Sequence, residues 1–310
     1  MKHKPHPHIV VVGSINMDLV ARSPRIPAPG ETIIGHDFHT VPGGKGANQA
    51  VAAARLGARV GLVARVGRDT FGRELIDGLA ANGVAADHVR ETPDVATGIA
   101  VILVDDTGEN SIVVAPGANM AVSEQDIEAA AGLIAAADVL LLQLEIPDAA
   151  VLKAAALARA ASVPVILNPA PARPLPPDLL SLVDILIPNE HEAALLAGHP
   201  LGSEEDMDVA ARRLLERGPR AVILTLGSRG ALLFDDDDRV RQPAFTVEAV
   251  DTTAAGDAFV AGFAVAWAEG KTTAEAVRWG AAAGALAATR LGAQPSLPRR
   301  SALLSLLQTA

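Results

Sequence analysis

The sequence predicts an α/β fold of three layers, in which a mostly parallel central sheet carries helices on both faces. Short apolar segments with strand character alternate along the chain with longer segments of helical period, and this alternation is typical of parallel sheets built from β–α–β units. Half of the 310 residues are hydrophobic, but only 3% are aromatic and none is tyrosine. A core of Ala, Val, Leu and Ile suits buried parallel strands beneath Ala-rich helices.

The predicted elements run through the whole chain without a linker-like segment between them. We therefore expect a single domain over residues 1–310. Strands are expected at His8–Gly13, Arg59–Gly67, Asp138–Leu144, Val163–Asn168, Asp184–Ile187, Ala221–Leu226 and Ala231–Phe234. Helices are expected at 43–56, Asp69–Asn82, Ser123–Ala136, Pro147–Ala161, Glu190–Ala197, Glu204–Arg217, Ala255–Glu269, Thr273–Thr289 and Arg299–Leu307.

Two segments do not fit the strand–helix alternation. The first, at about residues 19–41, holds three prolines and alternates only in its second half, and the second, at about 97–115, is typical of a β-hairpin that turns near Asp105–Asn110. We expect these strands to form a small sheet that covers the carboxyl ends of the main strands. The alternative is that they extend one edge of the main sheet. The acidic run Asp235–Asp238 is interpreted as a solvated hairpin turn.

Charge, cysteine content and hydropathy exclude several classes of function. The formal net charge of −10 disfavours a nucleic-acid partner. The absence of cysteine excludes disulfides, thiolate metal sites and a cysteine nucleophile. No segment reaches the roughly 18 uninterrupted apolar residues of a spanning helix. We therefore expect a cytoplasmic protein without a membrane partner.

The stretch Ala249–Trp267 has the strongest indications of chemistry. Its turn, Thr252–Gly256, has no bulky side chain to block a ligand, and we expect its free backbone amides at a helix N-terminus to bind an anion such as a phosphate. Asp257 follows in the first helical turn, where it can take a proton from a hydroxyl that attacks the phosphate. The alternative is that Asp257 only caps the helix, since Asp is a preferred residue at that position.

Other polar residues follow the ends of predicted strands, which meet at one edge of a parallel sheet. Each group alone is typical of a loop, whereas together they indicate a ligand site. Lys45 and Asn48 can donate to hydroxyls at a helix start, and Asn189 and Glu192 are spaced to hold water around Mg²⁺ beside phosphates. The strand-end groups are Asn16 and Asp18, Glu145, Asn168, Asn189 and Glu192, and Thr225–Gly230, whereas Gly43–Asn48 opens a helix.

Two common nucleotide motifs are absent. Gly44-Lys45 and Gly270-Lys271-Thr272 both lack the first glycine of a Walker loop. No G-x-G-x-x-G follows a predicted strand, which counts against an oxidoreductase with a dinucleotide cofactor.

Taken in order, these motifs resemble those of the ribokinase-like sugar kinases, the phosphofructokinase-B-type carbohydrate kinases. The resemblance covers essentially the whole chain, and it includes the stretches NQAVAAARLG, LNPAPAR, TLGSRGA and GAQPS. The motifs that carry it are Asn16 with Asp18, Gly43–Asn48, Asn189 with Glu192, and Asp251–Asp257.

The resemblance implies ATP-dependent phosphorylation of D-ribose at O5 to give D-ribose 5-phosphate. Asp257 would be the base, and Ala254, Ala255 and Gly256 would form the anion hole. The residues implied for ribose are Asn16, Asp18, Gly44, Lys45, Asn48, Glu145 and Asp257. Those implied for ATP are Asn189, Thr225, Gly227, Ser228, Gly230 and Gly256.

The resemblance also implies two metal ions and a second subunit. Glu192 would organise Mg²⁺ through water. A potassium ion beside the anion hole would activate the enzyme, and the small sheet would be a lid that pairs with the lid of a second subunit in a homodimer. The positions that match the potassium site are Asp251, Thr253, Ala287, Arg290, Gly292 and Ser296.

The sequence departs from the family at two points, and alternatives remain. Ala254 stands where the family commonly has glycine, and we expect a helix-like backbone there that tolerates a Cβ atom. Near the adenine, Trp279-Gly280-Ala281 replaces the Asn or His of many relatives. The alternatives are a kinase for 2-deoxyribose, fructose or adenosine, and a sugar-binding protein without catalysis. Polar rather than aromatic residues in the sugar loops favour a free sugar over a nucleoside.

Overall fold

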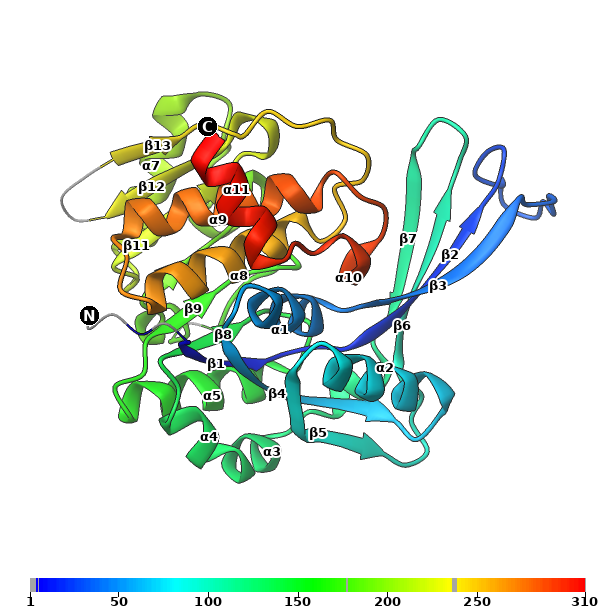
Figure 1. Ribbon diagram of the computed structural model, residues 1–310, viewed down its shortest axis with the longest axis horizontal. Coiled ribbons are helices and arrows are strands. Elements are labelled where there is room, and N and C mark those ends of the chain that lie inside the picture. The colour runs from blue at the N-terminus through cyan, green and yellow to red at the C-terminus, as the bar shows by residue number, and fades with distance from the viewer. Residues whose placement is uncertain (1–3, 5, 177, 236–238, 310) are drawn as a thin grey trace.

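The main sheet has nine strands, of which seven consecutive ones, ending at one edge of the sheet, are parallel. The computed structural model describes residues 4, 6–176, 178–235 and 239–309. Only the pairings β11–β12 and β12–β13 are antiparallel, which confirms the predicted α/β class (Figure 1). In spatial order the strands are β13 (Arg239–Gln242), β12 (Ala231–Asp235), β11 (Ala221–Thr225), β10 (Ile185–Leu186), β9 (Val165–Leu167), β8 (Val139–Leu142), β1 (His8–Val12), β4 (Arg59–Gly67) and β5 (Val84–Thr92).

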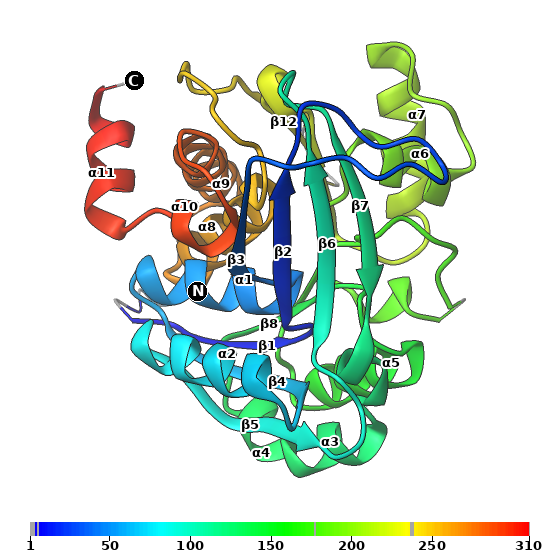
Figure 2. The same cartoon turned by 90° about the vertical axis from the view of Figure 1, so that its right-hand side faces the viewer.

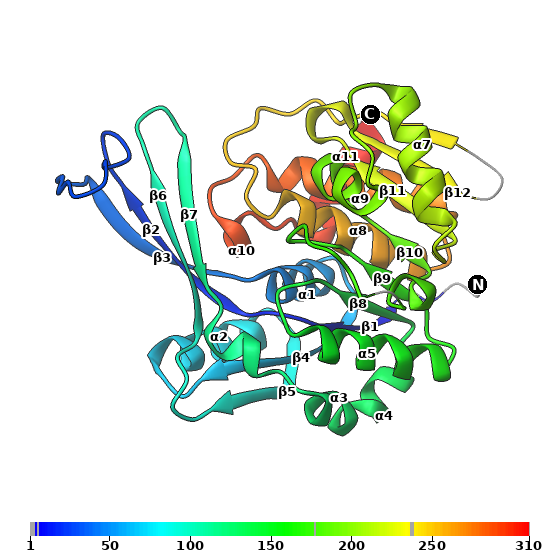
Figure 3. The ribbon, with the colours of Figure 1, turned by 180° about the vertical axis from the view of Figure 1, so that it is seen from behind.

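Helices cover both faces of this sheet, so the predicted three layers are present. One face packs against α1 (Lys45–Arg55), α2 (Thr70–Ala81), α8 (Ala255–Ala268), α9 (Thr273–Ala287) and α11 (Arg300–Thr309). The opposite face packs against α3 (Glu124–Ala129), α4 (Ala131–Ala135), α5 (Asp148–Ala160), α6 (Glu190–Ala197) and α7 (Glu204–Leu215). Figure 3 shows this second face with α5 and α7 toward the viewer.

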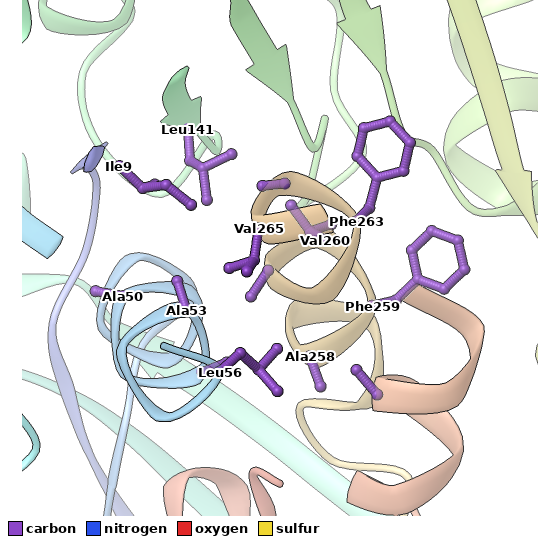
Figure 4. Close-up of a cluster of buried hydrophobic side chains, with 14 of the residues drawn as sticks. Ile9, Ala50, Ala53, Leu56, Leu141, Ala258, Phe259, Val260, Phe263 and Val265 are labelled. Atoms are coloured by element: carbon purple, nitrogen blue, oxygen red, sulfur yellow. The ribbon is translucent and has the colours of Figure 1, made fainter. Parts of the chain in front are cut away.

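Strand β1 shows how the sequence builds two cores from one sheet. Successive side chains of a strand point to opposite faces. Ile9 and Val11 lie in the core beneath α1 and α8, and Val10 and Val12 lie in the core beneath α5. Figure 4 shows the first core, where the alanines of α1 let that helix lie close to α8. The Ala-rich composition therefore brings together the N-termini of two helices that carry polar site residues.

A second, four-stranded sheet stands apart from the main sheet and extends beyond the body of the molecule (Figures 1 and 2). Strand β2 pairs parallel to β6, and the two outer pairings are antiparallel. The alternative of an extended edge of the main sheet is therefore wrong. The strands, in spatial order, are β3 (Asp37–Gly43), β2 (Asn16–Arg22), β6 (Gly98–Val104) and β7 (Asn110–Ala115).

Several features of the main fold differ from the expectations. Strand β13 and the short helix α10 (Ala293–Ser296) were not predicted. Strand β5 was not predicted, because its sequence VAADHVRET is mostly polar and its side chains are largely exposed at the sheet edge. The helix predicted at Ser123–Ala136 is two short helices, because the backbone at Ala130 (φ −96°, ψ 5°) leaves the helical region. Residues 236–238 of the acidic run lie outside the described residues. Among the helices of the described residues, none is long and apolar enough to cross a membrane.

Candidate active site

The predicted site residues meet at the carboxyl edge of the parallel strands. Helices α1, α6 and α8 begin there, and strands β1, β8 and β11 end there. Open α/β sheets bind their ligands at this edge, because the loops from neighbouring strands diverge and leave a crevice. The side chains described below come from segments that lie far apart in the sequence.

Asp257 lies at the centre of this edge, in the first turn of α8. It is 5% exposed, and its carboxylate accepts hydrogen bonds from two amides of α1. Asn48 Nδ2 donates to Oδ2 at 2.9 Å, and Gln49 Nε2 donates to Oδ1 at 3.1 Å. No side chain caps α8, whose N-cap residue is Ala254. The carboxylate is therefore held by another helix, and a capping role does not account for it.

The turn before α8 differs from the expectation in two respects. Ala254 has φ 59° and ψ 8°, a left-handed conformation that costs a residue with a Cβ atom roughly 1–2 kcal/mol. The predicted helix-like backbone at Ala254 is therefore wrong. The amide of Ala255 donates to the carbonyl of Thr252 at 3.1 Å, so it is already paired. Within the described residues, the amides of Ala254, Gly256 and Asp257 have no acceptor and remain available to an anion.

Three carboxylates and one ammonium group lie close together beside Asp257. Asp18, at 8% exposure, accepts no hydrogen bond from the described residues. Burial, and then repulsion by Glu145 and Asp257, raises the pKa of Asp18 to about 7. Burial lowers the pKa of Lys45, but Asp257, Glu145 and Glu192 outweigh burial and leave that pKa raised. Such a cluster suits a polar ligand with several hydroxyls, which can supply the donors that Asp18 lacks.

The glycines at the start of α1 make room for this cluster. A Cβ atom at Gly43 would lie 2.6 Å from Asp18 Oδ1 and 2.7 Å from its Cγ. Gly44 has φ 87°, and a Cβ atom there would lie 2.6 Å from the backbone nitrogen of Asn16. The backbone amide of Lys45 donates to Glu145 at 3.1 Å, and the Ser14 hydroxyl donates to the same carboxylate oxygen. Larger residues at Gly43 and Gly44 would displace Asp18 and Asn16.

Asn119 is a polar residue of this region that the sequence did not reveal. It is buried in the 3₁₀ helix η1 (Gly117–Ala121), and its Nδ2 donates to Asn16 Oδ1 at 2.7 Å. Its Oδ1 accepts from the backbone amide of Ile15 at 2.9 Å. Asn119 therefore fixes the side chain of Asn16. The only sequence signal was an Asn close behind the predicted hairpin, and that is common in loops.

A cavity of about 740 Å³ opens on the other side of the α8 N-terminus. All six residues predicted for the nucleotide line it, namely Asn189, Thr225, Gly227, Ser228, Gly230 and Gly256. Phe245, Phe259 and Ala281 contribute apolar wall, which suits a flat, apolar ring. Trp279 does not reach the cavity, because it packs in the core with Lys271 Nζ and Arg300 Cζ each 5.1 Å from its ring centroid.

Glu192 and Asn189 bind each other reciprocally at the start of α6. Asn189 Oδ1 accepts from the Glu192 amide and Glu192 Oε2 from the Asn189 amide, both at 2.8 Å. This is a capping box. Burial is the main cause of the raised pKa of Glu192. The described residues include no group of three or more His, Asp or Glu side chains placed to hold a metal ion, so a metal here would bind chiefly through water or ligand oxygens.

The segment predicted for potassium forms a closed loop beside the cavity. Asp251 Oδ1 accepts from the Thr253 amide and Oδ2 from the Gly292 amide, both at 2.8 Å. The amide of Asp251 donates to the Ala288 carbonyl at 3.2 Å. Residues 250–253 therefore lie against the end of α9 and the segment that follows it. Ser296 donates its hydroxyl to Ala293 in α10 (Ala293–Ser296).

Together, the fold and this edge define a phosphotransferase of small polar molecules. A buried carboxylate and free amides at one helix tip separate a polar cluster from a cavity with an apolar wall. The profile of the pfkB family carbohydrate kinases matches residues 6–300. The chain belongs to this family, and the predicted resemblance is confirmed.

Three comparisons show how similar the relatives are. A ribokinase of Haemophilus influenzae is 43% identical over 97% of this chain and 99% of that protein. A deoxyribokinase of Salmonella typhi is 37% identical over 94% of this chain and 95% of that protein. The structure of Arabidopsis thaliana ribokinase complexed with ribose and ATP has a TM-score of 0.91 and 39% identity, and it covers 98% of this chain and 100% of its own.

Proposed function

We propose that this protein is an ATP-dependent ribokinase that transfers the γ-phosphate of ATP to O5 of D-ribose. The observation that carries the proposal is the position of Asp257, which interacts with the polar cluster and directly follows Gly256, a residue of the cavity wall. Its carboxylate is held by two amides of another helix. The ribokinases that are about 40% identical over nearly the whole chain support ribose as the acceptor. The Arabidopsis complex with ribose and ATP supports the pair of substrates.

Ribose would bind in the polar cluster. Asp18 would accept hydroxyl donors that no described residue supplies, and Lys45 would donate from among the carboxylates that surround it. Asn48 has a buried Oδ1 without a partner among the described residues, and a sugar hydroxyl or an ordered water can satisfy it. The full proposed set is Asn16, Asp18, Gly44, Lys45, Asn48, Glu145 and Asp257.

The phosphoryl transfer requires a base and a site that stabilises negative charge. As the ribose O5 atom bonds to the γ-phosphorus, its proton passes to the Asp257 carboxylate, and the bond from phosphorus to the ADP oxygen breaks. General base catalysis contributes about 10²–10⁴-fold. The free amides of Ala254 and Gly256 would bind the transferring phosphoryl group, each contributing roughly 3 kcal/mol as at other oxyanion sites. The Ala255 amide donates to the Thr252 carbonyl, so it would act by holding the turn in shape and not by binding the phosphoryl group itself.

ATP would occupy the cavity with its phosphates toward the α8 N-terminus. Asn189, Thr225, Gly227, Ser228 and Gly230 would line the nucleotide, and the base would lie against the apolar wall. Glu192 would hold Mg²⁺ through water, since one of its oxygens already accepts the Asn189 amide. When bound, Mg²⁺ neutralises the charge that develops on the phosphate oxygens.

A potassium ion would be held by oxygens around the loop at Asp251. The described contacts fit such an ion, because they bring Asp251 and Thr253 beside Gly292. Carbonyl and hydroxyl oxygens are the donors that a hard cation prefers. The proposed ligands are oxygens of Asp251, Thr253, Ala287, Arg290, Gly292 and Ser296.

The small sheet would act as the lid of a single-domain enzyme and as its dimer surface. Strand β7 is exposed along its whole length and pairs on only one side, and an open edge of this kind invites pairing with another chain. Phe38, Ile112, Val113 and Val114 are exposed on the sheet. We propose a homodimer formed through these lids. We also propose a cytoplasmic location, where ATP is available to the enzyme.

A coupled assay of ADP release over a panel of sugars tests the proposal. We expect the highest kcat/KM with D-ribose, lower values with 2-deoxyribose and fructose, and little activity with adenosine. The Asp257→Asn variant should bind ribose in calorimetry but lose about 10²–10⁴-fold in kcat. Preference for 2-deoxyribose would reassign the substrate in line with the Salmonella relative. Ribose binding without ADP release would indicate a sugar-binding protein, and near-normal turnover by Asp257→Asn would exclude the base.

A further inference from the structure

Two buried glutamines form a chain of amides behind Asp257. Gln49 on α1 and Gln143 after β8 are both fully buried. Gln143 Nε2 donates to Gln49 Oε1 at 2.6 Å, and Gln49 Nε2 donates to Asp257 Oδ1 at 3.1 Å. Gln49 Nε2 also lies 3.3 Å from Asn168 Oδ1. The chain therefore connects the end of a central strand with the carboxylate of the proposed base.

The chain has a direction, which is set by its end at Asp257. An ionised carboxylate only accepts hydrogen bonds, so Gln49 must turn its NH₂ group toward Oδ1. Gln49 then presents its carbonyl to Gln143, and this carbonyl requires a donor there. The reversed amide would place the Gln49 oxygen against the Asp257 oxygen, which is repulsive. Gln143 holds Gln49 in the orientation that suits an ionised Asp257.

This arrangement leaves one acceptor without a partner at the end of the amide chain opposite Asp257. Gln143 Oε1 is buried and has no partner among the described residues. A Cβ atom at Gly13 would overlap this oxygen, so glycine gives it room. A buried acceptor without a donor destabilises a fold, and here it accompanies the donor that the pair supplies to Asp257. The hydrogen bond to Asp257, rather than the packing of an apolar core, therefore accounts for the glutamine pair.

We propose that Gln49 and Gln143 are positioning residues for phosphoryl transfer, which hold the Asp257 carboxylate in the orientation that accepts the hydroxyl proton. This inference rests on the proposed function. Gln49 acts on Asp257 directly, and Gln143 acts only through Gln49. Asn48 holds the other carboxylate oxygen, so the two oxygens are fixed by independent amides of one helix.

Other charged groups around Asp257 stay in place when the glutamines are changed. Lys45 on α1, Asp18 on β2 and Glu192 on α6 all interact with Asp257 electrostatically. A change in the pH dependence of a glutamine variant therefore reports the lost amide. The test compares Gln49→Leu, Gln143→Leu, the double variant and Gln49→Glu with the wild type. Leu79→Ala, a buried change in α2, controls for lost stability.

The measurements are kcat and KM for ribose across pH 5–9, ribose binding by calorimetry, and thermal unfolding. We expect Gln49→Leu to lower kcat about ten- to a hundredfold, within the contribution of the base itself, with ribose affinity changed less than threefold. The acid limb of kcat should move to higher pH. Gln143→Leu should have a smaller effect of the same kind. The double variant should match Gln49→Leu in kcat, because both residues act along one chain.

Gln49→Glu should move the acid limb further, because a second carboxylate then faces Asp257. Leu79→Ala should melt at a lower temperature with unchanged kcat and pH dependence. If wild-type enzyme phosphorylates ribose but Gln49→Leu keeps its kcat and pH profile, the positioning role is excluded while the proposed function stands. Multiplicative effects of the two leucine changes would exclude the chain. A wild type inactive on every sugar would overturn the proposed function itself.

Discussion

Replacement of Asp18 by asparagine should stabilise the unliganded protein while it weakens ribose binding. The folded state raises the pKa of Asp18 from 3.8 to about 7, mainly through burial and then through Glu145 and Asp257. Below pH 3.8 the residue is protonated in both states. Between pH 3.8 and about 7 the folded state binds more protons than the unfolded state, so the free energy of unfolding falls as the pH rises. Above about pH 7 the contribution of Asp18 to the free energy of unfolding no longer changes with pH.

The magnitude follows from the size of that shift. One pKa unit corresponds to about 1.4 kcal/mol, so ionised Asp18 lowers the free energy of unfolding by roughly 4 kcal/mol at pH 8, as an upper bound. Urea unfolding of wild type and Asp18→Asn at pH 5 and pH 8 measures this quantity. We expect the advantage of the variant to grow by about 2–3 kcal/mol between the two pH values, because part of the loss has already occurred at pH 5. Asp77→Asn, an exposed change on α2, is the matched control.

Ribose links this stability to the proposed function. The variant should bind ribose about ten- to a hundredfold more weakly in calorimetry, because a hydrogen bond to a charged group is worth about 1.5–3 kcal/mol. Ribose should therefore raise the melting temperature of the wild type more than that of the variant. An advantage of Asp18→Asn that stays constant from pH 5 to pH 8 would refute the buried-charge argument. Unchanged ribose affinity would remove Asp18 from the sugar site.

Three further substitutions test separate parts of the site. Ala254→Gly should raise the free energy of unfolding by about 1 kcal/mol with kcat within twofold, because the left-handed backbone at 254 favours glycine; a less stable variant in urea unfolding would contradict this reasoning. Gly43→Ala should raise the KM for ribose at least about tenfold, because its Cβ atom displaces Asp18; an unchanged KM in steady-state assays would show that Asp18 is free to move. Arg55 donates to the carbonyls of Gln294 and Leu297, in and just after α10, at 2.6 and 3.0 Å. Arg55→Met should therefore lower the free energy of unfolding by about 2–4 kcal/mol. It should also raise the potassium concentration for half-maximal activity. Sodium should support less activity than potassium in the same titration, and equal activity with both ions would exclude the proposed site.

The sequence predicted the main sheet because its strands are buried on both faces. An apolar run such as His8–Val12 has few other places in a fold. Edge strands lack this signal, since one side is open to water, and β5 was missed for that reason. The small sheet was predicted from prolines and alternation. Its separation from the main sheet depends on the pairing of β2 with β6, which are 75 residues or more apart and leave no local pattern.

The site was predictable where one segment supplies several groups. Gly43–Asn48 and Asp251–Asp257 each place their polar residues together by local geometry alone. Asn119, Gln49 and Gln143 were missed because each looks like an ordinary polar residue until distant segments meet. The roles of the predicted residues stay predictions, whereas their convergence at one sheet edge is a property of the fold.

The conformation of Ala254 differs from the prediction for a more specific reason. The sequence before α8 predicts the start of a helix, and a helical start tolerates alanine. In the structure the chain enters α8 through a left-handed residue, with the Thr253 amide bonded to Asp251 and the Ala255 amide bonded to Thr252. This left-handed turn leaves the amides of Ala254, Gly256 and Asp257 without an acceptor among the described residues. The strain at Ala254 and the free amides therefore have one cause.

The polar cluster and the turn at Ala254 both hold polar groups without a hydrogen-bond partner among the described residues. Asp18 and Asp257 lie close enough to repel one another, and Lys45 is attracted by Asp257, Glu145 and Glu192. The arrangement is unfavourable by itself. Under the proposed function, sugar hydroxyls that donate to the carboxylates would relieve it, just as a phosphate would relieve the free amides. Each substrate would then supply the groups that the fold lacks.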